Sequence, residues 1–429
     1  MEFINNRPYF NPICILFMII LGSCNNRTSK LNERTTQLTM DHSNYSDDVS
    51  FMKDYIDIIE LSDISGNAKI AVSAALQGRI MTSSSAGPKG RSYGWINREL
   101  FESGQIMDHM NAFGGEERFW IGPEGGQFSV FFKEGDAFTL ETWQTPALID
   151  TEPFEVKSIS PEKAVFTKTA SLVNYSGFKF DLGIDREVSI LSMETAFDEL
   201  GFDPMEGVKV VAYRTSNTLT NIGNADWKRE TGLLSIWLLG MFNPSPETTV
   251  VIPFIDGDGE LLGKRVNDDY FGKVPAERLI VNEGVIYFKA DGLERGKIGL
   301  SPSRAKNILG SYDASNQILT LIKYNKPDNN TSYVNSLWEI QDDPFNGDAI
   351  NSYNDGPPKP GMKPLGPFYE LETSSPAFEL TAGTSGTHDQ ITWHLEGDVD
   401  QLSKISKKIF GVSIKEITDV FVGSGINKN

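Results

Sequence analysis

Short runs of alternating or mostly apolar residues recur between residues 51 and 397, and Gly, Pro, Asn or Asp bounds each run. The runs are rich in β-branched and aromatic side chains, which favour strands, and turn residues separate them. Examples are the segments 69–75, 128–133, 208–215, 285–289 and 318–324. The pattern predicts a mainly all-β protein of antiparallel strands.

Helical spacing is clear only near the end of the chain. From Val399 to about Phe421 lysines alternate with apolar residues spaced for one helical face, namely Leu402, Ile405, Ile409, Val412 and Ile417. This spacing predicts one or two terminal helices with a break at Gly411. Residues 51–61 are expected to form a short helix that runs into the first strand.

Residues 13–24 form a short apolar run that ends in Leu21-Gly22-Ser23-Cys24. The run is shorter than the roughly 20 residues of a membrane-spanning helix, and it lies where a signal peptide belongs. Small residues before Cys24 are typical of a bacterial lipoprotein signal, in which the thiol carries a diacylglycerol. We therefore expect lipidation of Cys24; an ordinary secretory signal with a chance cysteine is the alternative.

These features divide the chain into four segments. Residues 1–23 are the predicted signal peptide, and 24–50, rich in Asn, Ser, Thr and Asp, are a disordered polar tether. Residues 51–397 form the β domain, and 398–429 form a C-terminal helical extension. The lipid anchor predicts a location in the cell envelope, on the periplasmic face of a membrane or at the cell surface.

Composition narrows the chemistry. The chain has two cysteines; Cys14 leaves with the signal and Cys24 takes the lipid, so no disulfide framework, thiolate zinc site or cysteine nucleophile is expected. The net charge is −19, from 39 Lys and Arg against 58 Asp and Glu. Such acidity argues against a nucleic-acid partner and against a polybasic membrane contact.

The densest group of chemically useful residues lies at 114–126. Among five glycines stand Arg118, Trp120 and Glu124, with two further glutamates. An aromatic face beside charged groups is typical of sugar sites, because the ring stacks on C–H groups while the charged groups bond hydroxyls. The alternative is a glycine-rich turn with Trp120 in the core.

A second candidate segment, 368–380, carries alternating carboxylates. The period of two places Glu370 and Glu372 on the face opposite Tyr369 and Leu371. If that face is concave, the two carboxylates line a cleft; if it is convex, they are solvated.

Two other stretches offer polar groups. Residues 217–227 contain Asn217, Asn221 and Trp227, and residues 338–356 cluster Asp and Asn oxygens. Such oxygens suit Ca²⁺, although the spacing matches no EF-hand loop. We predict no cofactor and no metal, with calcium at 338–356 as the alternative.

The Asn217–Asn221 stretch and Leu371-Glu372-Thr373 resemble two signatures of the galactose mutarotase (aldose 1-epimerase) superfamily. The glycine-rich run with Arg118 and Trp120 resembles relatives in an uncharacterised family of Bacteroidetes lipoproteins. The resemblance covers about residues 51–397. It implies a large antiparallel β-supersandwich of the galactose mutarotase type, whose concave face binds a sugar.

By this resemblance Glu372 is the base that acts on the anomeric hydroxyl. The mutarotases carry Asn-His where this chain has Asn221-Ile222, so their acid histidine is absent. General acid–base catalysis on a sugar needs both partners within hydrogen-bond reach. The residues that can replace the acid are Asp226, Arg118, His109 and Glu124.

The sequence therefore predicts an exported monomeric lipoprotein that binds a carbohydrate and carries epimerase-like acid–base chemistry. The expected binding residues are Arg118, Trp120, Glu124, Asn217, Asn221 and Trp227. The alternatives are a non-catalytic glycan-binding lipoprotein and a polysaccharide lyase or hydrolase on the same scaffold.

Overall fold

The computed structural model describes residues 43–329, 332–359 and 361–422. The predicted signal peptide, Cys24 and most of the predicted tether lie outside the described residues. Helix α1 (Tyr45–Lys53) begins inside the range assigned to the tether; Asn44 caps it, and its Tyr45 and Val49 are buried. The folded part therefore begins before residue 51. No helix of the described part is long and apolar enough to cross a membrane.

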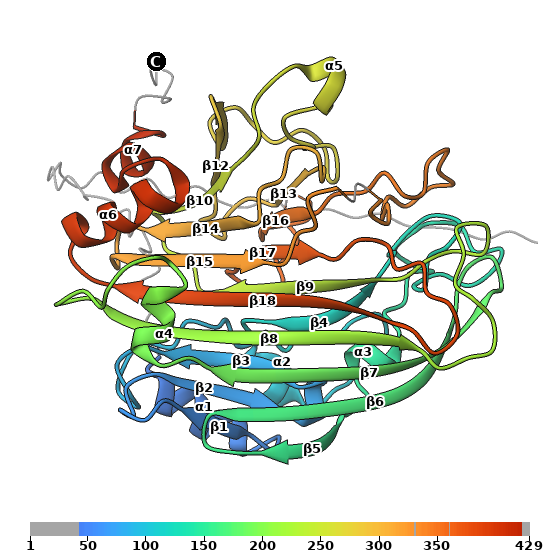
Figure 1. Cartoon of the computed structure of the whole chain (residues 1–429), viewed down its shortest axis with the longest axis horizontal. Helices are drawn as coiled ribbons and strands as arrows, with labels where there is room; N and C mark the ends of the chain where they lie inside the picture. Colours follow the sequence, from blue (N-terminus) through green and yellow to red (C-terminus); the bar gives the residue numbers. More distant parts are fainter. Residues whose placement is uncertain (1–42, 330–331, 360, 423–429) are drawn as a thin grey trace, which may run out of the picture. The chain divides into compact units, whose positions relative to one another are not determined.

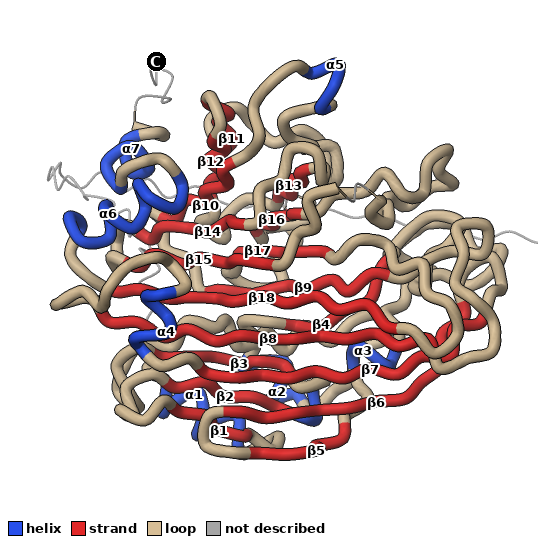
Figure 2. The backbone as a smooth tube through the Cα atoms, viewed as in Figure 1, coloured by secondary structure: helices blue, strands red, loops and turns tan. Residues whose placement is uncertain are grey.

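The strands of the described residues form three antiparallel sheets (Figures 1 and 2). The small one has the order β1-β2-β3 and comprises β1 (Ile59–Ser62), β2 (Lys69–Ser73) and β3 (Arg79–Ser84). The ten-stranded sheet has the order β11-β12-β10-β14-β15-β18-β8-β7-β6-β5. Its strands are β5 (Glu155–Ile159), β6 (Lys163–Val173), β7 (Lys179–Ile190), β8 (Lys209–Asn221), β10 (Thr248–Pro253), β11 (Leu279–Asn282), β12 (Val285–Lys289), β14 (Ile308–Asp313), β15 (Ile318–Tyr324) and β18 (Ser385–Glu396).

The five-stranded sheet carries the site described below and has the order β13-β16-β17-β9-β4. Its strands are β4 (Arg118–Gly122), β9 (Ser235–Phe242), β13 (Gly296–Leu300), β16 (Ile350–Asn354) and β17 (Tyr369–Ser374). The short helices between strands are α2 (Arg98–Ser103), the 3₁₀ helix η1 (Ala74–Leu76), α3 (Ala147–Asp150), α4 (Met193–Asp198) and α5 (Gly259–Leu262).

One face of the five-stranded sheet packs against the ten-stranded sheet. Tyr369 and Leu371 of β17 share a buried apolar cluster with Val250 and Ile322 of the large sheet. The hydroxyl of Thr373 lies 2.8 Å from Nε2 of His388 on β18. Because side chains alternate along β17, Glu370 and Glu372 face the other way. The predicted antiparallel β-sandwich is confirmed, and so is the alternation along this strand.

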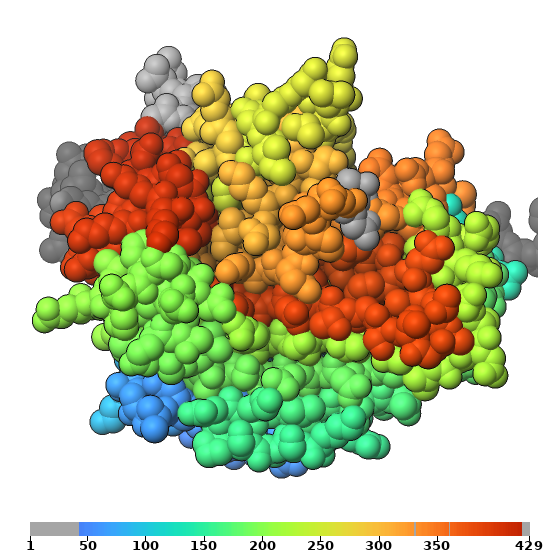
Figure 3. Space-filling view, in the orientation of Figure 1, coloured from blue at the N-terminus to red at the C-terminus, as the bar shows by residue number. Residues whose placement is uncertain are grey.

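The chain ends in α6 (Val399–Phe410) and α7 (Ile414–Asp419), which confirms the predicted terminal helices. Gly411 ends α6 with a φ of 84°, a left-handed conformation that glycine adopts without strain. Both helices bury their apolar faces in one cluster with Leu319 and Trp393 of the large sheet. In the space-filling view they form a continuous surface with the segment around α4 (Figure 3).

One predicted strand is wrong. Four of the runs in the first paragraph correspond to β2, β8, β12 and β15, but 128–133 is a loop. Its backbone bonds to its own preceding turn, since Val130 N donates to Pro123 O and Ser129 N donates to Gly126 O. Phe131 and Phe132 are nevertheless buried. The apolar pattern thus reflects burial of this loop and not pairing in a sheet.

Candidate functional site

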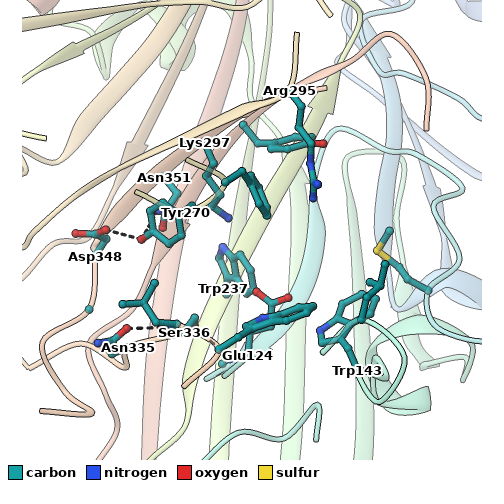
Figure 4. Close-up of a pocket in the computed structure, with 18 of the residues that line it drawn as sticks. Glu124, Trp143, Trp237, Tyr270, Arg295, Lys297, Asn335, Ser336, Asp348 and Asn351 are labelled. Atoms are coloured by element: carbon teal, nitrogen blue, oxygen red, sulfur yellow. Dashed lines mark hydrogen bonds between the residues drawn. The ribbon is translucent and has the colours of Figure 1, made fainter. Parts of the chain in front are cut away.

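A cavity of about 810 Å³ lies over the face of the five-stranded sheet that carries Glu370 and Glu372 (Figure 4). Strand residues form its floor, among them Trp237 of β9, Lys297 of β13 and Asn351 of β16. Loops that follow β4, α5 and β15 build the walls. Its volume lies within the usual range of small-molecule binding sites.

A buried ion pair underlies the cavity floor. Nζ of Lys297 lies 3.1 Å from Oε2 of Glu372, and Nε1 of Trp237 donates to the same oxygen at 2.9 Å. Glu372 is 0% exposed and does not line the cavity. Within the described residues its other carboxylate oxygen has no hydrogen-bond partner. Glu372 therefore holds two cavity-lining side chains from below.

Lys297 carries a firmly held positive charge. Burial works to lower its pKa, but the charges of Glu372, Glu124 and Glu370 outweigh burial and raise the pKa above its usual value. The ammonium also lies 4.9 Å from the ring centre of Trp237, within cation–π range. It is a fixed cation that faces both the cavity and a buried carboxylate.

Glu124 is one of the acid–base groups that line the cavity. It follows β4, and its backbone N–H donates to Oγ of Ser336 at 3.1 Å. Burial raises the pKa of its carboxyl to about 7; Lys297 opposes this rise and Glu372 adds to it. Near neutral pH both protonation states are populated, which is the condition for general acid–base catalysis.

Aromatic rings form much of the wall. The indoles of Trp143 and Trp338 stack with centroids 5.9 Å apart and an interplanar angle of 24°. Apolar side chains also lie where the cavity meets solvent. These are Met107, Leu140 and Phe271, which line the cavity and are half or more exposed. Flat apolar faces of this kind suit the C–H faces of a sugar ring.

Across the cavity from Trp143 lies a preorganised polar group (Figure 4). The Tyr270 hydroxyl donates to Asp348 at 2.5 Å and accepts from Nδ2 of Asn351 at 3.0 Å, and Nδ2 of Asn267 donates to Asp348 at 3.3 Å. Burial raises the pKa of Asp348. Because these groups are hydrogen-bonded to one another without a ligand, their remaining donors and acceptors point in defined directions.

Asp348 belongs to the stretch 338–356 that the sequence offered for calcium. Another of its carboxylates, Asp355, accepts from the Tyr353 hydroxyl at 2.9 Å and from Gly366 N at 2.9 Å. In the part of the chain that the structure describes, no group of three or more His, Cys, Asp or Glu side chains is arranged to hold a metal ion.

Of the residues predicted at 114–126, Glu124 alone lines the cavity. Arg118 is buried and pairs with Glu370 on the sheet face. Trp120 is 4% exposed and packs edge-on against Trp237, with centroids 5.5 Å apart. Arg118 and Trp120 therefore lie beneath the cavity lining, beside Glu370 and Trp237.

The structure does not bring Asn217, Asn221 and Trp227 to the cavity: all three are buried and none lines it. Asn217 accepts from Arg186 between the sheets. Asn221 shapes its own loop by donating to Ala225 O and Leu380 O at 2.8 and 3.1 Å. Trp227 lies in the apolar core.

The structure also narrows the choice of acid. Glu124 and His109 line the cavity, whereas Asp226 and Arg118 do not. Nδ1 of His109 lies 2.6 Å from the carbonyl oxygen of Trp143, which fixes the ring and leaves Nε2 as the nitrogen available to a ligand.

Several cavity residues were missed from the sequence, namely Trp143, Trp237, Tyr270, Arg295 and Lys297, and Trp338 and Asp348 were offered only as part of a calcium-binding stretch. A signal existed for two of them. Arg295 and Lys297 stand two apart beside an apolar strand, so alternation places both on one face. The tryptophans at 143 and 338 lie in loops, and no local pattern separates them from core residues.

Comparison with known proteins gives a family and a fold. The model of a family of unknown function (DUF6786) matches residues 43–421. No curated protein matches.

The similar solved structures include two with mutarotase names. A putative aldose 1-epimerase from Escherichia coli is 11% identical with a TM-score of 0.44, covering 80% of this chain and 100% of that chain. A galactose mutarotase-like protein from Lactobacillus casei is 10% identical with a TM-score of 0.42, covering 79% and 99%. A Synechocystis protein is 11% identical with a TM-score of 0.46, covering 80% and 98%. At such scores function has to be argued from the side chains of the site.

Proposed function

Because the chain belongs to the DUF6786 family, whose function is unknown, we propose its function from the cavity: it binds a carbohydrate there and carries out acid–base chemistry on it through Glu124. The observation that carries the proposal is a carboxyl group with a pKa raised to about 7 in an aromatic-walled cavity. Perturbed titratable groups in a cleft are typical of catalytic sites.

The walls supply recognition. Trp338 is partly exposed to the cavity and offers a face for a sugar ring. The hydrogen-bonded group of Tyr270, Asp348 and Asn351 lies across the cavity and offers donors and acceptors for hydroxyls. Glu124 lies between Trp143 and this polar group (Figure 4), so a ligand that fills the cavity would lie beside its carboxyl.

The chemistry best suited to this set is epimerase-like ring opening at the anomeric carbon. One group removes the proton of the anomeric hydroxyl, the bond from the anomeric carbon to the ring oxygen breaks, and that oxygen receives a proton. We assign one of these transfers to Glu124 and the other to His109. Lys297 stabilises negative charge that develops on either oxygen.

In this proposal Glu372 is a positioning residue and not the base that the resemblance implied. Its carboxylate is covered, and it acts by holding Lys297 and Trp237. The same burial favours a second candidate function, a glycan receptor without catalysis. Glu372 occupies the motif position of the mutarotase base, but its covered carboxylate is not placed to contact a ligand in the cavity.

The test is a binding screen of mono- and oligosaccharides, followed by NMR of the anomeric signals of each sugar that binds. Accelerated exchange between anomers, or a new product, supports the enzyme. Binding without chemical change supports the receptor, and a screen with no binding contradicts both.

The location is a separate proposal. We propose that the mature protein is attached to a membrane of the cell envelope through a lipid on Cys24, since the apolar run before it ends in Leu21-Gly22-Ser23-Cys24. Labelling cells with a radioactive fatty acid tests this: the chain should carry label and the Cys24→Ser variant should not.

A further inference from the structure

Arg295 reaches the cavity with a guanidinium that forms no hydrogen bond or ion pair with any residue the structure describes. It is exposed and lines the cavity just before β13. In the described ranges its side chain has no hydrogen-bond partner, and no carboxylate oxygen lies within 4.0 Å of it. The other two basic residues of the lining are paired, Lys297 with Glu372 at 3.1 Å and Lys363 with Glu99 at 2.5 Å.

The guanidinium is nevertheless held in place. Its central carbon lies 3.8 Å from the ring centre of Phe271, which also lines the cavity. Stacking on an aromatic ring fixes the plane of a guanidinium while its N–H edges stay free. A planar fork of N–H donors matches the two oxygens of a carboxylate, or of a sulfate, better than a neutral hydroxyl.

The position of this fork relative to the rest of the site is set by the strand. Arg295 and Lys297 are two residues apart, so both point to the same side of the sheet. Figure 4 shows them entering the cavity together, across from Glu124 and Trp143. A bound anion at Arg295 therefore lies within the same cavity as the acid–base group.

The nearby carboxylate of Asp355 does not occupy the N–H edges of the Arg295 guanidinium. Arg295 attracts it electrostatically. However, one of its oxygens accepts from the Tyr353 hydroxyl and the other from Gly366 N. Its hydrogen bonds thus go to its own loop and strand, and the guanidinium edge is left to a ligand.

We propose that the carbohydrate bound in the cavity is acidic, carrying a carboxylate as in a uronic acid or a sulfate ester, and that Arg295 binds that group. The inference rests on the proposed function, because the anion is placed as part of the sugar.

The test compares sugars that differ only at the last carbon: galactose, galacturonic acid and galactose 6-sulfate, with glucose, glucuronic acid and glucose 6-sulfate. Affinities are measured by calorimetry on the chain that follows the predicted signal peptide. A charge-assisted bidentate contact should make an acidic sugar bind roughly 10- to 100-fold more tightly than its neutral counterpart. The preference should fall as salt is added. Whichever acid binds better identifies carboxylate or sulfate as the group recognised.

Two variants locate the effect. Arg295→Gln should remove the preference, so that each acidic sugar binds no more tightly than its neutral counterpart. Arg265→Gln is the matched control, because Arg265 is paired with Asp256 at 2.8 Å and does not line the cavity. This variant should prefer the acidic sugar to the same degree as the unaltered protein.

The outcomes separate the two proposals. Equal affinity for neutral and acidic sugars overturns the role of Arg295 and leaves the proposed carbohydrate site standing. An acid preference that survives Arg295→Gln also overturns it. Absence of binding to every sugar in the set and in the wider screen overturns both.

Discussion

The ammonium of Lys297 lies 3.1 Å from the carboxylate of Glu372, and the two side chains are 11% and 0% exposed. The pair joins the cavity lining to the sheet face that lies beneath it. Through it a fully covered carboxylate fixes a cation that a ligand can touch. Glu372 thus orders a cavity-lining side chain without lining the cavity itself.

Removal of one partner of this pair should be costly. Lys297→Met leaves Glu372 buried without its counter-ion, and we expect the free energy of unfolding to fall by about 3–5 kcal/mol. Lys297→Met combined with Glu372→Gln should recover part of that loss, because neither charge remains. Urea unfolding at neutral pH measures the free energy of unfolding of Lys297→Met, of Glu372→Gln and of the double variant. If the loss in the double variant equals the sum of the two single losses, the two side chains are not directly coupled.

Glu124→Gln should remove acid–base chemistry. The amide has nearly the same shape but cannot transfer a proton, so we expect the rate of anomeric exchange to fall roughly 10²–10⁴-fold with little change in sugar affinity. Glu134→Gln is the control, since Glu134 is exposed and does not line the cavity. Unchanged exchange in Glu124→Gln would assign the chemistry to another group, with His109→Gln the next variant.

The same substitution should change how stability depends on pH. Burial raises the pKa of Glu124 from 4.5 to about 7. The folded state therefore binds this proton more tightly than the unfolded state. Its contribution to stability is complete below pH 4.5, declines as pH rises toward 7 and is absent above it.

The wild type should therefore lose up to about 3 kcal/mol relative to Glu124→Gln as pH rises across this window. Lys297 and Glu372, the charged groups that act on Glu124, are unchanged in the variant. Chemical unfolding of both proteins over a pH series measures the difference, and parallel profiles would rule out a raised pKa.

Two tryptophans should respond differently to truncation. Trp338→Ala removes a partly exposed cavity wall and should weaken sugar binding by about 1–3 kcal/mol, taking the stacking of bases on aromatic side chains as the analogue. Trp120→Ala leaves a hole in the core and should cost about 3–5 kcal/mol of stability. Calorimetry measures sugar affinity and urea unfolding measures stability for each variant. If Trp120→Ala weakened binding and Trp338→Ala lowered stability instead, both assignments would be wrong.

Much of the secondary structure was predictable because its signals are local. The run at 318–324 matches β15, and the break at Gly411 separates α6 from α7. The run at 128–133 was mistaken for a strand because burial of a loop produces the same apolar pattern as burial of a strand. Periodicity reports that a segment is covered, not what covers it.

The sequence by itself determined the alternation of Glu370 and Glu372 with Tyr369 and Leu371, since the period of a strand is set by its own backbone. It also marked Glu124 as a candidate. Only the tertiary structure decided that Glu124 faces the cavity while Glu372 lies beneath it. The reason is that β13 and β17, two strands far apart in the chain, join one sheet and place Lys297 over a carboxylate 75 residues away. Pairing between distant strands and the loops that close over them, not local pattern, determine which side chains meet a ligand.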